Sequence, residues 1–444
     1  MDIIWILTEE KPKNKVVAII LKELLKEKYI KDKFENLKIK PVIENCKFQF
    51  KYSIVGISCC IIIKLIQAKQ GSFVDYLVFK KAVEPNNDDR PIYVIEETKT
   101  TPAESRNVSV YQRLSKFVFV DSFPIMEKSK KIMLYNIRQK YDTIPNTFVF
   151  GVRSMKTLDI NILGLENIEQ YAKFDSLNDL MNSKNKISTK RKDNVPIQLF
   201  KQNNTTVSIT AKLEKSKKLG HDPNIGAVTA LAKLVKITSP DITKIIVKNH
   251  GLTQDMVRNK SSKFIKLATP LGIELDGLTI DCISIKEEYW EYSKCNEKIV
   301  SILVHNILDY NNCKVIYDNH AGSEQGYFEF PDGTLESIKK KTSKPDLIFM
   351  DKTEQILYVI EAEKSSNVFK KRSGVDQLSD FDDVENIYCS KYEGHSYERR
   401  VICHGNELSQ KELDDNSILL QLKTDGTFMF SKDCPDWFKQ CFQS

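Results

Sequence analysis

The sequence lacks the signatures of several common protein classes. No two of its ten cysteines form a C-x-x-C pair, which argues against a zinc ribbon. None of its six histidines forms an H-x-x-x-H pair or joins a Cys/His ligand set, so we interpret them as structural or surface residues. No G-x-x-x-x-G-K-[ST] loop occurs, which excludes the usual nucleotide-driven motors.

Long apolar runs are also missing, and none reaches the roughly 18 residues that a membrane helix needs. The opening residues carry two acids after a short apolar run, a pattern that does not match a secretion signal. Several cysteines stand in apolar runs such as "ISCCIII", where free cysteine behaves as a small hydrophobic residue. We therefore expect a protein of the reducing cytoplasm that does not enter the membrane.

The chain has 444 residues, of which 41% are hydrophobic and 29% charged, enough for two or three folded domains. The formal net charge is +7. This is a mild preference for polyanionic partners, well short of the excess in a histone.

Residue patterns predict alternating helices and strands in the first and last thirds of the chain. The first third reads as a helix, several strands, a helix and a further strand: 14–33, 48–57, 59–66, 73–79, 92–99, 110–120 and 147–152. The last third reads as a helix, three strands, the start of a helix and a strand: 294–308, 313–318, 344–351, 355–364, 374–381 and 399–405. The predicted fold class is α/β, with a mixed sheet flanked by helices.

The middle of the chain has a different character. Lys, Asn, Ser and Thr dominate 182–218, which we interpret as a basic linker with a short strand at 205–212. Asp222 and Pro223 then open a helix. Residues 241–268 suggest helix, glycine turn and helix, a pattern compatible with a DNA-reading helix-turn-helix. We predict three regions, 1–181, 182–290 and 291–444, with the middle one helical and able to bind DNA.

One seven-residue pattern occurs twice, as "YVIEETK" at 93–99 and "YVIEAEK" at 358–364. A glutamine follows the last lysine by thirteen residues in both copies, at Gln112 and Gln377. An aspartate lies just inside the apolar strand that precedes each copy. Such matched spacing indicates a duplicated module rather than two accidental strands.

Alternation along a strand places residues i and i+2 on one face. Glu97 and Lys99 therefore project together in the first copy, as do Glu361 and Glu363 in the second. The upstream aspartates, Asp75 and Asp346, can join these pairs from the neighbouring strand. Carboxylate oxygens suit Mg²⁺, which activates a bound water and neutralises a phosphate.

These residues resemble the PD-(D/E)xK nuclease superfamily, the fold of most Type II restriction endonucleases, over about 14–151 and 294–405. The resemblance implies Asp346, Glu361 and Glu363 as metal ligands in the second module, with Lys364 assisting. Glu363 takes the place that the family usually gives to lysine. In the first module it implies Asp75, Glu97 and Lys99. Aligning the two copies favours Glu96 over Glu97, and both stay open.

The resemblance further implies Mg²⁺-dependent hydrolysis of double-stranded DNA at a specific sequence, leaving 5′-phosphates. Expected partners are double-stranded DNA and, functionally, a DNA methyltransferase. Two working modules would let one chain cut both strands, whereas a single working module would need a homodimer or two successive visits to the DNA. A repair or phage-defence nuclease of the same fold is one alternative. A non-catalytic DNA-binding protein is another, although its retained carboxylates would not help it bind phosphates.

Overall fold

The computed structural model describes residues 3–25, 37–42, 51–55, 60–69, 72–99, 110–136, 146–187, 196–220, 222–257, 263–281, 288–293, 297–319, 326–338, 342–351, 353 and 355–443. Two compact units divide the chain: Met1–Gln67 with Tyr292–Ser444, and Ala68–Glu291. Mixed sheets flanked by helices make up both units, so the predicted α/β class is confirmed. Among the described residues, no helix is long and apolar enough to cross a membrane.

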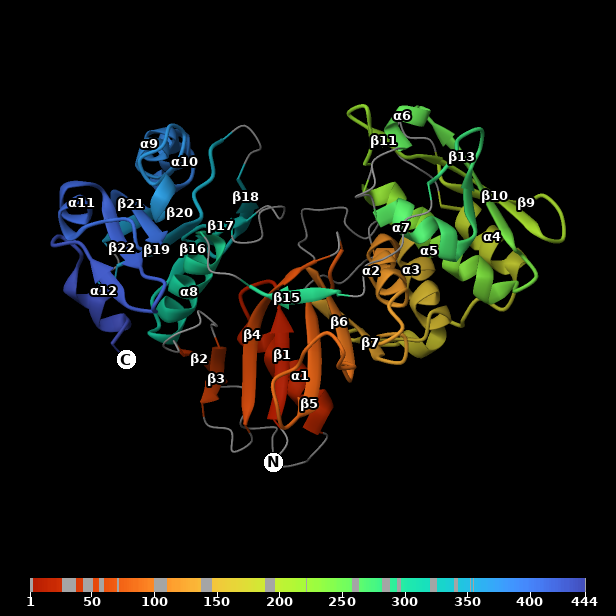
Figure 1. Ribbon diagram of the computed structural model, residues 1–444, viewed down its shortest axis with the longest axis horizontal. Coiled ribbons are helices and arrows are strands. Elements are labelled where there is room, and N and C mark those ends of the chain that lie inside the picture. Colours follow the sequence, from red (N-terminus) through yellow and green to blue (C-terminus); the bar gives the residue numbers. More distant parts are fainter. Residues whose placement is uncertain are drawn as a thin grey trace. The chain divides into compact units, whose positions relative to one another are not determined.

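The C-terminal part of the first unit contains a six-stranded sheet in the order β16-β19-β20-β21-β22-β23 (Figure 1). β19 is antiparallel to β16 and β20, whereas β20, β21 and β22 are parallel and β23 is antiparallel. The strands are β16 (Val315–Asp318), β19 (Leu347–Met350), β20 (Ile356–Lys364), β21 (Ser396–His404), β22 (Ile418–Leu422) and β23 (Phe428–Phe430).

Five α-helices surround this sheet. They are α8 (Glu297–Tyr310), α9 (Gly374–Gln377), α10 (Asp382–Ile387), α11 (Gln410–Asp415) and α12 (Asp436–Cys441). α8 contacts β20 and β21, and α9 contacts the same two strands. A short hairpin, β17 (Tyr327–Glu329) with β18 (Leu335–Ser337), completes the region.

The N-terminal part of the first unit has the strand order β2-β3-β4-β1. β1 was not predicted, yet it is almost wholly buried and lies parallel to β4. α8 also contacts β2, so this part shares a unit with the C-terminal sheet. The elements are β1 (Ile3–Thr8), α1 (Asn14–Leu25), β2 (Lys38–Val42), β3 (Lys51–Val55) and β4 (Ile61–Ala68).

The second unit contains two strand paths, β5-β6-β7-β8 and β14-β13-β10-β9. The first path uses β5 (Tyr76–Lys81), β6 (Tyr93–Lys99), α2 (Val110–Val120), β7 (Lys130–Asn136), α3 (Asn146–Thr157), β8 (Ile160–Leu163) and α4 (Leu177–Asn185). The second uses β9 (Gln198–Lys201), β10 (Thr206–Lys212), β11 (Glu214–Lys215), β12 (Lys218–Leu219), α5 (Asp222–Thr238), β13 (Lys244–His250), α6 (Gln254–Val257), α7 (Lys263–Leu271) and β14 (Ile273–Leu275). The short strand β15 (Trp290–Tyr292) lies at the end of the unit.

Two paths in the molecule follow the same course. β5 is antiparallel to β6, which is parallel to β7 across α2, and β7 is parallel to β8 across α3. β19, β20, β21 and β22 repeat these directions, with α9 and α10 in the place of α2 and with α11 in the place of α3. We name them the N copy (β5 to β8) and the C copy (β19 to β22). The sequence duplication therefore corresponds to a duplicated topology.

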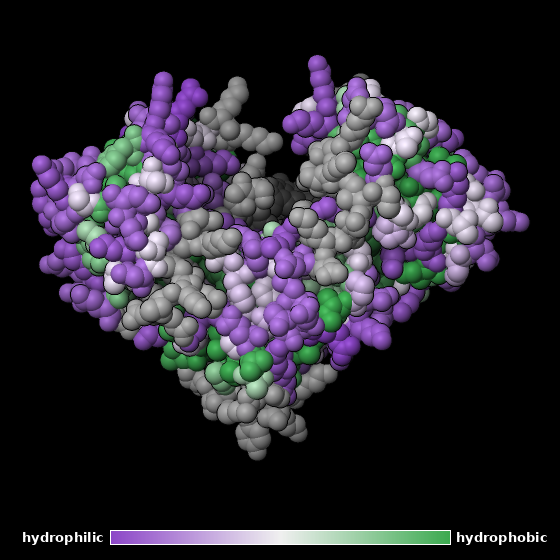
Figure 2. Space-filling view, viewed as in Figure 1, coloured by the Kyte–Doolittle hydropathy of each residue, from purple (hydrophilic) through white to green (hydrophobic). Residues whose placement is uncertain are grey.

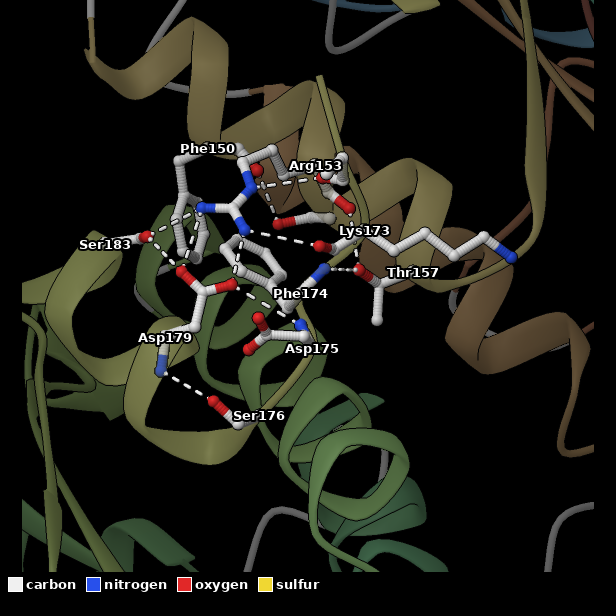
Figure 3. A network of polar contacts seen from close by, with 11 residues as sticks. Phe150, Arg153, Thr157, Lys173, Phe174, Asp175, Ser176, Asp179 and Ser183 are labelled. Atoms are coloured by element: carbon white, nitrogen blue, oxygen red, sulfur yellow. Dashed lines mark hydrogen bonds and ion pairs between the residues drawn. The ribbon is translucent and has the colours of Figure 1, made fainter. Parts of the chain in front are cut away.

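A polar and aromatic contact joins α3 to α4 in the second unit (Figure 3). The Arg153 guanidinium donates to both Asp179 carboxylate oxygens and, at 3.0 Å, to the Ser183 hydroxyl. Its carbon lies 4.3 Å from the centre of the Phe174 ring. Ser176 caps α4 by accepting a hydrogen bond from the Asp179 amide. This contact fixes the chain where it leaves the N copy.

Two local predictions were wrong. Residues 147–152 form part of α3 rather than a strand, because the aromatic run buries Phe148, Val152 and Met155 at helical spacing. The first helix of the predicted helix-turn-helix is the strand β13, in which Ile245 and Val247 alternate into the core. The middle region therefore contains a sheet as well as helices. By contrast, the strand predicted at 205–212 is confirmed, because it corresponds to β10.

The two compact units change over at 67/68 and 291/292 along the chain, and the three regions 1–181, 182–290 and 291–444 stay a prediction. α2 packs against α5, which keeps the middle region in one unit with the N copy.

Candidate functional site

The C copy brings its aspartate and first glutamate together through strand register. Leu347 pairs with Ile360, so Asp346 lies opposite Glu361. The Asp346 amide donates to the Ile360 carbonyl at 2.9 Å, and its Oδ2 accepts from the Ala362 amide at 2.9 Å. Because cross-strand partners share a face, both carboxylates project from one side of the sheet, and Glu363 follows by alternation. We name these residues with Glu297 the C cluster.

Burial makes this cluster electrostatically costly. Glu361 is 7% exposed, and its Oε2 has no hydrogen-bond partner among the described residues. Burial, followed by repulsion from Asp346 and Glu363, raises the pKa of Glu361 to about 9. Burial also raises the pKa of Asp346 to about 7, against the lowering effect of the Ala362 amide and with Glu297 and Glu363 adding to the rise. Among the described residues, no cation pairs with Asp346 or Glu361 to stabilise their ionised forms.

Glu297, at the start of α8, belongs to the same cluster and was not foreseen. Its Oε2 is buried without a hydrogen bond, and the Lys364 Nζ lies 3.7 Å away. Its charge acts on Asp346, so the two side chains are neighbours. A glutamate at a helix start is a common feature of sequences. Glu297 joins the cluster because the fold packs α8 against β20, a contact that the sequence alone does not indicate.

Glu363 and Lys364 stand at the end of β20. Glu363 is held by the Lys364 amide at 2.8 Å and by the Ser373 hydroxyl. Lys364 is exposed apart from its contact with Glu297. Within the described part of the chain, no three His, Cys, Asp or Glu side chains are gathered as a ready metal site. Glu363 would have to leave Ser373 before it could share a cation with Asp346 and Glu361.

The N copy brings together a similar pair of acids but surrounds them with cations. Tyr76 pairs with Ile95, so Asp75 lies opposite Glu96, and Asp75 Oδ2 accepts from the Glu97 amide at 2.6 Å. Two side chains of α2 complete the group. Arg113 lies 3.0 Å from Glu96 Oε1, and Lys116 lies 2.8 Å from Glu96 Oε2 and 3.5 Å from Asp75 Oδ1. We name Asp75, Glu96, Arg113 and Lys116 the N cluster.

This register selects Glu96 as the partner of Asp75. Glu97 is buried on the other face of β6 by strand alternation. Lys99 belongs to β6 opposite Asn136, and its side chain lies outside the described residues. Glu97 meets Asp75 through its backbone amide, and strand alternation sets its side chain on the face of β6 opposite to that of Glu96. The lysine beside the aspartate is Lys116, which no strand motif could have indicated.

The charges of the N cluster compensate one another. Burial, then Asp75, raises the pKa of Glu96 to about 7, whereas Lys116 and Arg113 lower it. Burial alone would lower the pKa of Lys116, but Asp75 and Glu96 outweigh that effect and raise it. Two carboxylates face two cations, so this cluster is complete without a metal ion.

Sequence spacing shows what the C copy has in place of these cations. The same interval of 265 residues that relates Glu96 to Glu361 relates Arg113 to Leu378 and Lys116 to Phe381. Leu378 and Phe381 are both buried and belong to the core of the C copy. The C copy therefore keeps the acids and replaces both cations by apolar side chains.

A scan against protein-family models, a search of curated proteins and a search of solved structures found no match to this chain.

Proposed function

We propose that the chain is a Type II restriction endonuclease, which hydrolyses phosphodiesters of double-stranded DNA with Mg²⁺ at the C cluster. The observation that carries this proposal is the pair of buried carboxyls, Asp346 and Glu361, which no cation of the described part of the chain compensates. Buried acids that repel one another are costly for a fold to keep, and they cluster at functional sites. A divalent cation removes that cost.

The topology of the C copy supports the same conclusion. An antiparallel pair of strands, a helical crossover and a third parallel strand follow α8, as the PD-(D/E)xK resemblance implies. The acids lie where β19 begins and towards the end of β20, so they share one end of these two neighbouring strands. Likeness of fold alone would not establish an activity, so the proposal depends on the cluster.

Asp346, Glu361 and Glu363 would hold the ion, with Glu297 as a further carboxylate within reach. When bound, Mg²⁺ would lower the pKa of a water molecule and offset charge on the scissile phosphate. Lys364 is placed beside Glu297 to orient water or to stabilise the charge on the phosphorus. Ser373 holds Glu363 in place until a cation competes for it.

The N cluster has its own cations, so the chain would have a single working site. A break in both strands would then require two chains or two successive encounters with DNA. This favours a homodimer. Protection of the host by a methyltransferase belongs to the same proposal.

Digestion of unmethylated plasmid DNA tests the proposal. Cleavage should need Mg²⁺ or Mn²⁺ and stop with EDTA, and Ca²⁺ should support binding without cutting, because the proposed ligands are hard oxygens. Sequenced ends should share one sequence and carry 5′-phosphates. Full activity in EDTA would contradict the metal mechanism, and ends at random positions would contradict a restriction enzyme.

A further inference from the structure

The middle region follows the same path as the N and C copies. β9 is antiparallel to β10, β10 is parallel to β13 across α5, and β13 is parallel to β14 across α6 and α7. The strand order β9-β10-β13-β14 thus matches β5-β6-β7-β8 and β19-β20-β21-β22. We name this third occurrence the M copy.

The M copy has apolar residues at the positions of the acids. Gln198 pairs with Thr210, so the residue before β9, Ile197, lies opposite Ala211. In the other copies these two positions hold an aspartate and a glutamate. Ile197 and Ala211 are both buried. The Lys184 ammonium donates to the Ile197 carbonyl at 2.7 Å. No carboxylate chemistry remains at this place.

Immediately after β10, the M copy projects a small basic hairpin, β11 with β12. Lys215 and Lys218 pair directly across it, and Lys217 stands in the turn between them. Ser216 and Lys217 both have positive φ angles, 55° and 58°, which residues other than glycine seldom adopt. All three lysines are exposed, and Figure 2 shows this hairpin as a hydrophilic projection.

Such a hairpin is costly for the isolated fold. Like charges directly opposite one another across two strands destabilise them, and the left-handed turn adds strain. Among the described residues, no carboxylate forms an ion pair with Lys215, Lys217 or Lys218; Glu214 accepts only from the Lys217 amide. Neighbouring ammonium groups are stabilised by a polyanion such as duplex DNA, which carries one negative charge about every 1.7 Å along its axis.

We propose that the M copy is a non-catalytic version of the repeated module and that its β11–β12 hairpin binds the phosphates of duplex DNA. The inference rests on the proposed nuclease function, because that function supplies the DNA. It adds a binding surface that is separate from both carboxylate clusters. The hairpin contacts the backbone through charge and therefore reads no sequence.

The test compares two double variants with the same change of charge. Lys215→Gln/Lys218→Gln removes the paired lysines, and Lys201→Gln/Lys244→Gln replaces the last residue of β9 and the first residue of β13, both of which lie beside the start of β10. Affinity for a duplex is measured at several salt concentrations in Ca²⁺, which allows binding without cleavage. The hairpin variant should bind about tenfold more weakly, with a salt slope lower by about 1.8, while the control keeps the wild-type values.

Stability provides a second readout. Removing the like-charge pair should leave the hairpin variant at least as stable as the wild type to urea, so weaker binding cannot come from unfolding. If the wild type binds and cuts DNA and both variants bind equally well, only this inference is wrong. If the wild type binds no DNA under any condition, the proposed function fails and this inference fails with it.

Discussion

The N and C clusters place an aspartate and a glutamate in the same register but differ in what faces them. Glu96 meets Arg113 and Lys116 at 3.0 Å and 2.8 Å, whereas Glu361 has an oxygen with no hydrogen-bond partner among the described residues. In the N cluster two cations face the aspartate and the glutamate, whereas among the described residues no cation pairs with Asp346 or Glu361, and Lys364 reaches only Glu297. The acids alone would not distinguish them. The residues of the following helix decide which cluster needs a cation from solution.

Repetition explains how one fold can carry such different sites. A module keeps its strand directions and apolar core while the few positions at one sheet edge change. In this chain those positions hold uncompensated acids, compensated acids or, in the M copy, apolar residues. The chemistry therefore changes between the three copies while their fold stays the same.

The largest expected contrast comes from the same substitution in both clusters. Glu361→Gln removes a proposed metal ligand, so plasmid cleavage should fall a thousandfold or more. The metal-free variant should nevertheless be more stable than the wild type by about 2 kcal/mol at pH 8.5, because a neutral amide replaces an uncompensated buried acid. Glu96→Gln should have the opposite effect on stability, because it leaves Arg113 and Lys116 without their acid.

The direction in which Glu361 changes the free energy of unfolding depends on pH. The pKa of Glu361 is raised to about 9, so its protonated form stabilises the fold. That stabilisation is complete below pH 4.5 and is lost as the pH rises toward 9. Urea unfolding in EDTA should therefore show wild type and Glu361→Gln alike near pH 4.5 and well apart at pH 8.5. If the wild type and Glu361→Gln were equally stable at both pH values, Glu361 would not be a buried, uncompensated carboxyl.

A second substitution would make the N cluster resemble the C cluster. Lys116→Met keeps an unbranched side chain that is one atom shorter and removes its charge, which should destabilise the fold by about 3 kcal/mol at pH 8. Divalent cations should recover part of this loss, because they can replace the missing ammonium. The experiment uses an Asp346→Asn background, so that any rise in melting temperature with Ca²⁺ comes from the N cluster. No response to Ca²⁺ would mean that the N cluster cannot hold a metal ion.

Much of the framework was readable from the sequence. The helix at 110–120, the strand that ends at Lys99 and the strand that ends at Lys364 were predicted because apolar periodicity and turn residues mark them clearly. Residues 147–152 were misread, since a short run of aromatic and β-branched residues suits either a strand or a buried helix.

The site was harder to predict, because it is assembled by contacts between distant elements. The choice between Glu96 and Glu97 depends on the register with β5, which the motif does not contain. Lys116 and Glu297 lie 20 residues after Glu96 and 64 residues before Glu361, on helices whose docking the sequence does not state. The third copy was missed for a related reason: its Ile197 and Ala211 leave no acidic motif to find.

Cleavage of supercoiled plasmid by Asp75→Asn and Asp346→Asn tests the central claim most directly. The account predicts that Asp346→Asn produces neither nicked nor linear DNA, while Asp75→Asn cuts within about threefold of the wild-type rate, because only in the C cluster do the buried aspartate and glutamate face no cation among the described residues. Circular dichroism and binding in Ca²⁺ would show that both variants are folded and still bind DNA. Cutting at the wild-type rate by Asp346→Asn, or loss of cutting in Asp75→Asn alone, would contradict it.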